Sequence, residues 1–180
     1  MLRAKDTLLL VVDFQGKLAR IVQDSAAVLG AAGKLIRGAR VLEVPIVCTE
    51  QNPQGLGPTV PELAELLPPD GRVLPKFHFS CWRDPAIRQA VKDAGCKQVL
   101  LAGIESHVCV YQTASDLRSA SYDVHLAVDA ISSRTAANRQ IGLAKAQAEG
   151  AVLTSVESAL FELLEVAQGE KFKEILKIVR

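Results

Sequence analysis

The chain has 180 residues, of which 49% are hydrophobic and 4% aromatic, and its formal net charge is +1. This length suits one domain with a full aliphatic core, so we expect a single domain over residues 1–180. The balanced charge gives no reason to expect a nucleic acid or an acidic membrane surface as a partner. No apolar run is long enough to span a bilayer. The four cysteines show no C-x-x-C spacing, which favours a reduced, cytoplasmic protein.

Short apolar runs bounded by turn residues predict strands along the whole chain. These runs cover Thr7–Val12, Ile46–Cys48, Arg72–Leu74, Gln98–Ala102, Tyr122–Val128 and Ala151–Leu153. Helical spacing and capping residues predict helices between and after them. The expected helices are Ser25–Val44, Pro61–Leu67, Asp84–Ala94, Thr113–Ala120, Ala136–Glu149, a segment from Thr154 to about Val166, and Phe172–Val179. The turn-rich segment Gln51–Pro58 is predicted to be a loop.

This alternation of strands and helices predicts an α/β fold. We expect a three-layer α/β/α sandwich around a mostly parallel six-stranded sheet, which is a Rossmann-like arrangement. In such sheets ligands bind at the carboxyl ends of the strands, where the strand order reverses. Asp13, Lys76 and the stretch Gly103–Cys109 each lie at such an end, so we expect the functional site there.

Cys109 is the candidate nucleophile, because it lies near the N-terminal end of the helix that follows the fourth strand. The helix dipole at that end is expected to lower the pKa of the thiol. Cysteine is also among the most buried residue types, so a structural role in the core is the alternative. His107 is only two residues away and points in another direction on a helix. His78, from the loop after the third strand, remains a minor alternative partner.

Asp13 is the candidate general base for this thiol, although a lone Asp after a strand is also a common helix cap. Phosphatases with an aspartate nucleophile place Asp at the same point, but they need a second Asp where this chain has Gln15. No G-x-G-x-x-G motif follows the first strand, so a dinucleotide site is not supported. Lys76 would supply an ammonium that stabilises a thiolate and a developing oxyanion.

Three motifs resemble those of the isochorismatase-like hydrolases, also called cysteine hydrolases. They are LLLVVDFQGKLA around Asp13, LPKFHFSCW around Lys76 and LLAGIESHVCVYQTASDL around Cys109, with VDAISSR following from Val128. TEQNPQGLGPTVPEL, from Thr49, and the C-terminal FKEILKIV resemble the isochorismatase-domain-containing branch of that family. The resemblance covers nearly the whole chain and implies the isochorismatase-like hydrolase fold.

The resemblance implies a catalytic triad of Asp13, Lys76 and Cys109. The aspartate takes the thiol proton, the lysine supports the charged states, and the thiolate forms a covalent intermediate that water hydrolyses. It also implies a non-proline cis peptide between Ile104 and Glu105, which aims the amides of Glu105 and Cys109 at the oxyanion.

The chain departs from the metal-binding relatives, because Thr49, Glu50, Gln51 and Asn52 follow the second strand with no histidine. The spacings His78-x-x-Cys81 and His107-x-Cys109 are poor metal motifs, so no metal and no cofactor is expected. Cys109 favours hydrolysis of a small molecule at an amide or related C–N bond. The alternatives are vinyl-ether hydrolysis and a non-catalytic relative that binds a metabolite or a protein.

The expected pocket walls are Phe14, Glu50, Gln51, Phe77, Trp82 and Tyr111. The amphipathic segment Phe172–Val179 is expected either to dock back on its own chain or to meet a partner subunit. Together with the habit of the family, it predicts a homo-oligomer, a dimer or a tetramer.

Overall fold

The computed structural model describes residues 1–69 and 72–180 of the chain. In this part of the chain six strands form one sheet, in the order β3-β2-β1-β4-β5-β6. The strands are β1 (Thr7–Val12), β2 (Ile46–Gln51), β3 (Arg72–Lys76), β4 (Gln98–Ile104), β5 (Asp123–Ser132) and β6 (Val152–Thr154). Every neighbouring pair is parallel. The predicted α/β class and parallel sheet are therefore confirmed.

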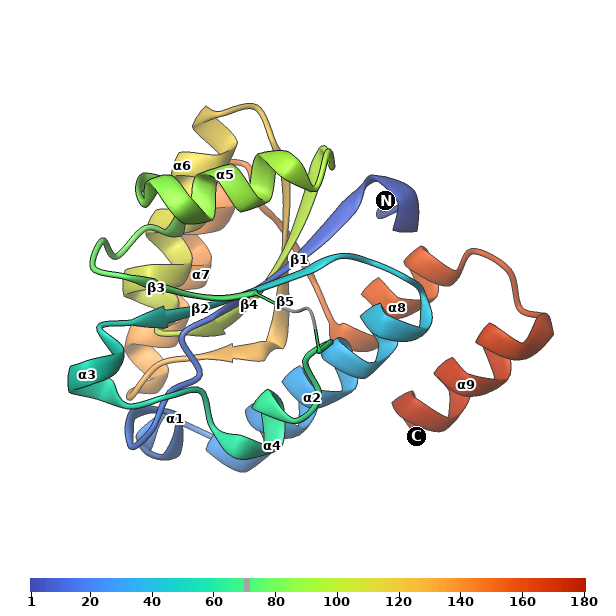
Figure 1. Cartoon of the computed structure of the whole chain (residues 1–180), viewed down its shortest axis with the longest axis horizontal. Coiled ribbons are helices and arrows are strands. Elements are labelled where there is room, and N and C mark those ends of the chain that lie inside the picture. The colour runs from blue at the N-terminus through green and yellow to red at the C-terminus, as the bar shows by residue number, and fades with distance from the viewer. Residues whose placement is uncertain (70–71) are drawn as a thin grey trace.

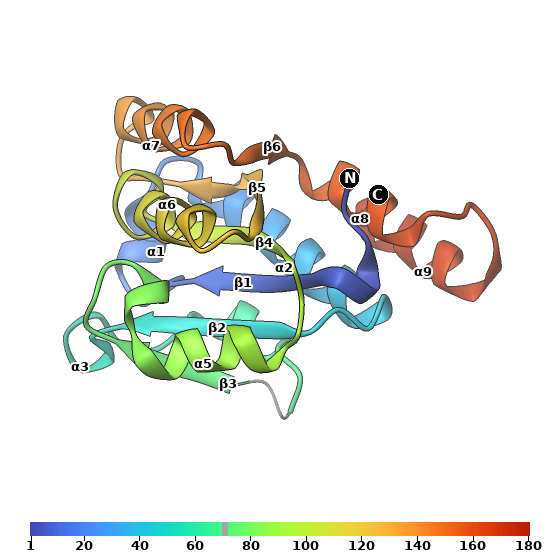
Figure 2. The same cartoon turned by 90° about the horizontal axis from the view of Figure 1, so that it is seen from above.

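Helices cover both faces of this sheet (Figures 1 and 2). One face carries α2 (Ser25–Val41), α4 (Pro61–Ala64), α8 (Val156–Leu164) and α9 (Gly169–Val179), and the other carries α5 (Pro85–Asp93), α6 (Tyr111–Ser119) and α7 (Ala136–Ala148). Leu9 and Val11 of β1 pack toward the first layer, whereas Leu8, Leu10 and Val12 pack toward the second. Because helices cover both faces, every residue of β1 is buried, as its continuous apolar sequence predicts.

Short helical elements fill the connections. The structure has 3₁₀ helices at Ala4–Asp6 and Cys81–Arg83, helices α1 (Leu18–Ile21) and α3 (Pro53–Leu56), and a π-helical turn over Ser106–Val110. The segment Gln51–Pro58, which the sequence predicts to be a loop, thus contains one turn of helix, with Pro53 at its first position.

The strand order reverses about β1, whose two neighbours are β2 and β4. The carboxyl ends of β1 and β4 therefore lie side by side at the switch point, where open α/β sheets bind ligands. Asp13 directly follows β1, and Glu105 and the π-helical turn directly follow β4. Lys76 is the last residue of β3, at the same edge of the sheet.

The C-terminal helix α9 docks on its own chain. Its Ile175 is completely buried in the cluster that includes α2. The ammonium of Lys34 donates to the carbonyl of Val179 over 2.9 Å, and Lys171 pairs with Glu43 over 2.7 Å. The apolar stripe of this segment is therefore used within the chain. Over the part of the chain described, no helix combines the length and the apolar character needed to cross a membrane.

Candidate active site

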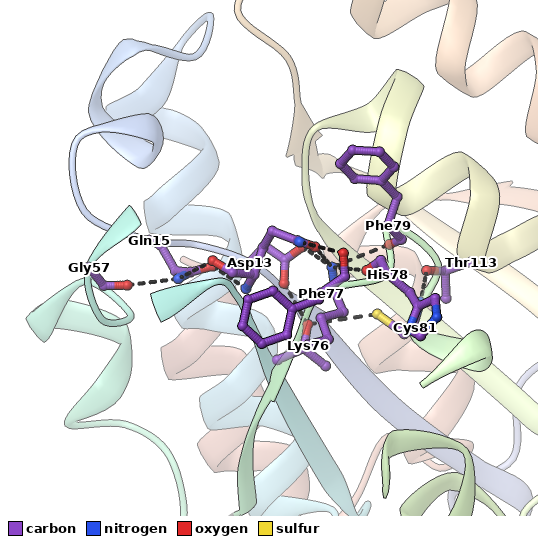
Figure 3. A network of polar contacts seen from close by, with 11 residues as sticks. Asp13, Gln15, Gly57, Lys76, Phe77, His78, Phe79, Cys81 and Thr113 are labelled. Carbon is purple, nitrogen blue, oxygen red and sulfur yellow. Dashed lines mark hydrogen bonds and ion pairs between the residues drawn. The ribbon is translucent and has the colours of Figure 1, made fainter. Parts of the chain in front are cut away.

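Asp13 occupies the point where β1 ends, and its side chain is 1% exposed. Its φ of 57° turns the chain sharply after the strand, and its amide donates to the carbonyl of Thr49 over 3.1 Å. The hydroxyl of Thr49 donates to Oδ1 of Asp13 over 2.8 Å, and the ammonium of Lys76 donates to Oδ2 over 2.6 Å. Both oxygens of the carboxylate are thus held in place, one from β2 and one from β3. Figure 3 shows Asp13 beside Lys76.

Lys76 is a completely buried lysine surrounded by acceptors. Besides Asp13, its ammonium donates to Oε1 of Gln51 over 2.7 Å and to the carbonyls of His78 and Phe79 over 3.3 and 3.2 Å. Burial lowers the pKa of Lys76, but the charge of Asp13 and the nearby thiols Cys81 and Cys109 outweigh it, so the pKa is raised overall. Lys76 therefore carries its positive charge at neutral pH.

Cys109 lies within the π-helical turn Ser106–Val110, which follows a cis peptide between Ile104 and Glu105. The carbonyl of Glu105 accepts from the amides of Val108 and Val110, over 3.0 and 3.3 Å, and the Cys109 amide lies between these two. This wide turn places the thiol over the carboxyl end of β4.

Helix α7 holds the turn in place by backbone contact. A Cβ atom added to Gly142 of α7 would lie 2.3 Å from Oγ of Ser106 and 2.5 Å from the amide of His107. Only glycine permits this approach. Ser106 is also tied to α7, because its hydroxyl donates to the carbonyl of Arg139 over 2.9 Å.

The pKa of the Cys109 thiol is raised above its ordinary value, chiefly by burial and then by the negative charge of Asp13, against the opposing effect of Lys76. The expectation that the helix terminus lowers this pKa is therefore wrong, because burial and a facing carboxylate outweigh the dipole of the short first turn. The thiol holds its proton, and Asp13 faces it as an acceptor.

A cavity of about 180 Å³ opens at this point. It is lined by Asp13, Leu18, Gln51, Leu56, Phe79, Ile104, Glu105, Val108 and Cys109. Asp13 and Cys109 thus share one small space, with Lys76 directly behind the carboxylate. Of the expected wall residues, Gln51 lines this cavity.

The isochorismatase domain model matches residues 7–158, which include Asp13, Lys76 and Cys109. The chain belongs to the isochorismatase family. It is 38% identical to isochorismatase domain-containing protein 2 of Homo sapiens, over 97% of this chain and 83% of that protein. This relative places the chain in the isochorismatase-domain-containing branch, as its sequence motifs indicate.

Two solved structures share the isochorismatase fold over nearly the whole chain. One is described as MAR1 ribonuclease from Caenorhabditis elegans, with 35% identity, a TM-score of 0.93, and coverage of 99% of this chain and 91% of that one. The other is YcaC from Pseudomonas aeruginosa with hexane-2,5-diol and covalent acrylamide, with 28% identity, a TM-score of 0.91, and coverage of 98% and 90%. Membership of the isochorismatase family supports a hydrolase-type function.

Five of the expected wall residues are not among those that line the cavity of this isochorismatase-family protein: Phe14, Glu50, Phe77, Trp82 and Tyr111. The turn at Asp13 sends Phe14 into the core, where it is fully buried. Glu50 accepts from the amide and hydroxyl of Thr59, over 2.6 and 2.8 Å. Phe77 is 73% exposed. Trp82 packs edge-on against Tyr122, and Tyr111 lies under the ammonium of Lys145.

Four cavity residues were not expected from the sequence: Leu18, Leu56, Phe79 and Val108. Leu18 and Leu56 belong to helices of four residues, which are too short to show an apolar period. Phe79 was signalled only by its place in the aromatic segment after Lys76. Its main-chain carbonyl accepts from the ammonium of Lys76 over 3.2 Å, a contact that no sequence pattern reveals.

The two histidines considered as partners of Cys109 make other contacts. Nδ1 of His107 lies 3.0 Å from the hydroxyl of Ser133. His78 is half exposed, and its ring lies 4.0 Å from the carboxylate of Asp84.

Gln15 closes the loop that leads to α3. Its Nε2 donates to the carbonyls of Gln51 and Gly57 over 3.1 and 2.7 Å, and its Oε1 accepts from the amide of Gln51 over 2.6 Å. Gln15 stands where a phosphatase with an aspartate nucleophile would carry its second aspartate. In this protein it holds the loop before α3 in place. Within residues 1–69 and 72–180, no group of three or more His, Cys, Asp or Glu side chains is arranged to hold a metal ion.

Proposed function

We propose that this isochorismatase-family protein is a cysteine hydrolase that cleaves a small molecule at an amide or related C–N bond. The observation that carries this proposal is the shared cavity, in which the thiol of Cys109 faces the carboxylate of Asp13. Lys76, paired with Asp13 over 2.6 Å, balances the charge of that carboxylate. No other element of the chain is needed to supply a nucleophile, a base and a cation.

The proposed reaction begins when Cys109 attacks the carbonyl carbon of the bound amide. As the S–C bond forms, the thiol proton passes to Asp13, and the carbonyl oxygen becomes an oxyanion. The amides of Glu105 and Cys109 are the proposed donors to that oxyanion. When the C–N bond breaks, Asp13 returns the proton to the leaving amine, and a thioester remains on Cys109.

Water then attacks the thioester, and Asp13 takes a proton from the water. The thiolate leaves and recovers that proton, so the net reaction converts an amide and water to an acid and an amine. In this scheme the raised pKa of Cys109 is compatible with catalysis, because the thiol gives up its proton only during attack, to the carboxylate of Asp13 in the same cavity. Thr49 and Lys76 fix the two oxygens of Asp13 while the proton moves.

The YcaC relative with covalent acrylamide supports a nucleophile in this fold. Acrylamide is a small primary amide that alkylates thiols. It is also of a size that suits a cavity of about 180 Å³.

Mass spectrometry of the acylated enzyme tests this function. The protein is mixed with a panel of small primary carboxamides, quenched in acid and digested, while released ammonia is measured. We expect ammonia release and an acyl group on the peptide that contains Cys109, with Cys48, Cys81 and Cys96 unmodified. Binding of a carboxamide without ammonia or acylation would favour a non-catalytic binding protein. Magnesium-dependent release of phosphate from phosphate esters would favour a phosphoryl-transfer enzyme.

A homo-oligomer is also proposed, now on a different surface from α9. Phe77 and Phe79, in the segment that follows Lys76, are 73% and 54% exposed, and Phe79 also lines the cavity. Neighbouring exposed aromatic side chains are typical of contact surfaces. We expect light scattering to give the mass of a dimer or tetramer, and Phe77→Ser to shift it toward the monomer. A wild-type protein that stays monomeric at high concentration would contradict this.

The free thiols of all four cysteines suit a reducing setting such as the cytoplasm.

A further inference from the structure

Two carboxylates line the cavity, but the cations that pair with them do not. Asp13 and Glu105 are both lining residues, whereas Lys76 and Arg134 lie outside the lining. Nε of Arg134 donates to Glu105 over 3.0 Å, and its side chain is 56% exposed to solvent. The inner surface of the cavity is therefore negative, with the balancing positive charges set back from it.

The carboxylate of Glu105 is held through one of its two oxygens. The main-chain amide of Arg134 and its Nε both donate to Oε2, each over 3.0 Å. No hydrogen bond from the described residues reaches Oε1. The other polar wall, Gln51, is already used, because its Oε1 accepts from Lys76 and its Nε2 donates to the carbonyl of Phe77 over 2.9 Å.

The remaining walls are apolar. They come from Leu18, Leu56, Phe79, Ile104 and Val108. The volume of about 180 Å³ is below the roughly 300–1,000 Å³ of pockets for drug-sized ligands. The cavity thus suits a small, mostly apolar molecule that offers an N–H donor to one carboxylate.

We propose that Glu105 determines specificity by excluding anionic substrates and by accepting a hydrogen bond from the N–H of a small uncharged carboxamide. This rests on the proposed function, since it orients the amide whose carbonyl meets Cys109. A substrate with its own carboxylate, or the phosphodiester chain of an RNA, would bring negative charge against Asp13 and Glu105 together. Electrostatic repulsion of this kind discriminates strongly in a small, poorly hydrated space.

The test compares two alkylating reagents of the same shape, iodoacetamide and iodoacetate. Both form an S–C bond with a thiol as iodide leaves, but the first is a neutral amide and the second is an anion. Labelling rates at Cys109 are measured by mass spectrometry at one pH, and their ratio is divided by the ratio for free glutathione. We expect this normalised preference for iodoacetamide to be about tenfold or more, as one added unit charge near a buried carboxylate requires.

Two variants should move the preference in opposite directions. Glu105→Gln removes one of the two negative charges that line the cavity, so the preference should fall severalfold below the wild-type value, with the remainder due to Asp13. Arg134→Met removes the compensating cation but keeps the main-chain amide that holds Glu105, so the preference should rise. If Glu105 and Arg134 had only a structural role, both variants would change the labelling preference in the same direction. Glu170→Gln, an exposed carboxylate on α9 that pairs with Lys173, is the matched control and should match the wild type. Thermal melting confirms that each variant is folded.

The outcomes separate this inference from the proposed function. If Cys109 is labelled by both reagents with the ratio of free glutathione, the specificity role of Glu105 is wrong and the nucleophile stands. The same holds if Glu105→Gln leaves the preference unchanged. If Cys109 reacts with neither reagent nor with the smaller neutral thiol reagent methyl methanethiolsulfonate, the nucleophile itself is wrong, and the inference falls with it.

Discussion

Asp13→Asn is expected to lower the free energy of unfolding by about 3–5 kcal/mol, the cost of leaving one member of a buried ion pair without its partner. Lys76 is completely buried, and Asp13 is the one carboxylate that its ammonium contacts within the described structure. An asparagine keeps the size of the side chain and can still accept from Thr49, so the loss comes mainly from the missing charge. Urea denaturation at neutral pH measures it. Hydrolysis should be lost as well, because an amide cannot take the thiol proton.

Asp116→Asn provides the matched control for this stability effect. Asp116 pairs with Arg83 over 2.7 Å, close to the 2.6 Å of the Asp13–Lys76 pair, but Arg83 is 62% exposed. Exposed ion pairs contribute about 0–1 kcal/mol, so this variant should remain near wild-type stability. Equal losses in the two variants would show that burial of Lys76 is not the reason for the effect.

Cys109→Ser is expected to reduce hydrolysis at least about 10³-fold while leaving the fold intact. A serine hydroxyl is far less acidic than a thiol, and Asp13 is too weak a base to activate it. The measurement is ammonia release from the best carboxamide of the panel, with a thermal melt of each variant. Activity that survives Cys109→Ser would instead make Asp13 the nucleophile.

Cys96→Ser is the matched control for this activity loss. Cys96 lies between α5 and β4, and its thiol donates to the carbonyl of Ala94 over 3.3 Å, a contact that a serine hydroxyl can also make. This variant should keep wild-type hydrolysis. A parallel loss in Cys96→Ser would mean that thiol removal acts through stability and not through the proposed chemistry.

The strands could be predicted well because burial on both faces of the sheet requires a continuous apolar run in the sequence. The β1 run Thr7–Val12 was predicted with the bounds that the structure has. Strand β5 runs to Ser132 and not to Val128, since a register irregularity against β4 between Leu101 and Gly103 lets it continue past the polar Asp129. Helices α1 and α3 have four residues each, and so few positions carry no period that could have revealed them.

The site could be predicted only in part. Strand ends brought together Asp13, Lys76 and the Cys109 turn, because parallel strands share one carboxyl edge. The walls could not be predicted from neighbours in sequence, since Phe14 is buried in the core after the turn at Asp13, and Phe79 lines the cavity whereas Phe77 does not. The pKa of Cys109 could not be predicted from its helix, because burial raises it most and the next largest effects come from Asp13, directly after β1, and Lys76, at the end of β3.

The hydrogen bonds from Lys76 to the carbonyls of His78 and Phe79 have a consequence for how this protein can change its substrate. The ammonium that holds the base also anchors the wall containing Phe79, so any insertion or deletion in residues 77–80 would alter reactivity together with pocket shape. Helix α3, which carries Leu56, is tied to the same lysine, because the amide of its N-cap residue Asn52 donates to the carbonyl of Lys76 over 2.9 Å. Leu18 stands on α1, and no hydrogen bond of the described residues joins α1 to Lys76. Directed evolution of new substrate preferences should therefore accumulate substitutions in α1, where the cavity can be reshaped without disturbing the ion pair.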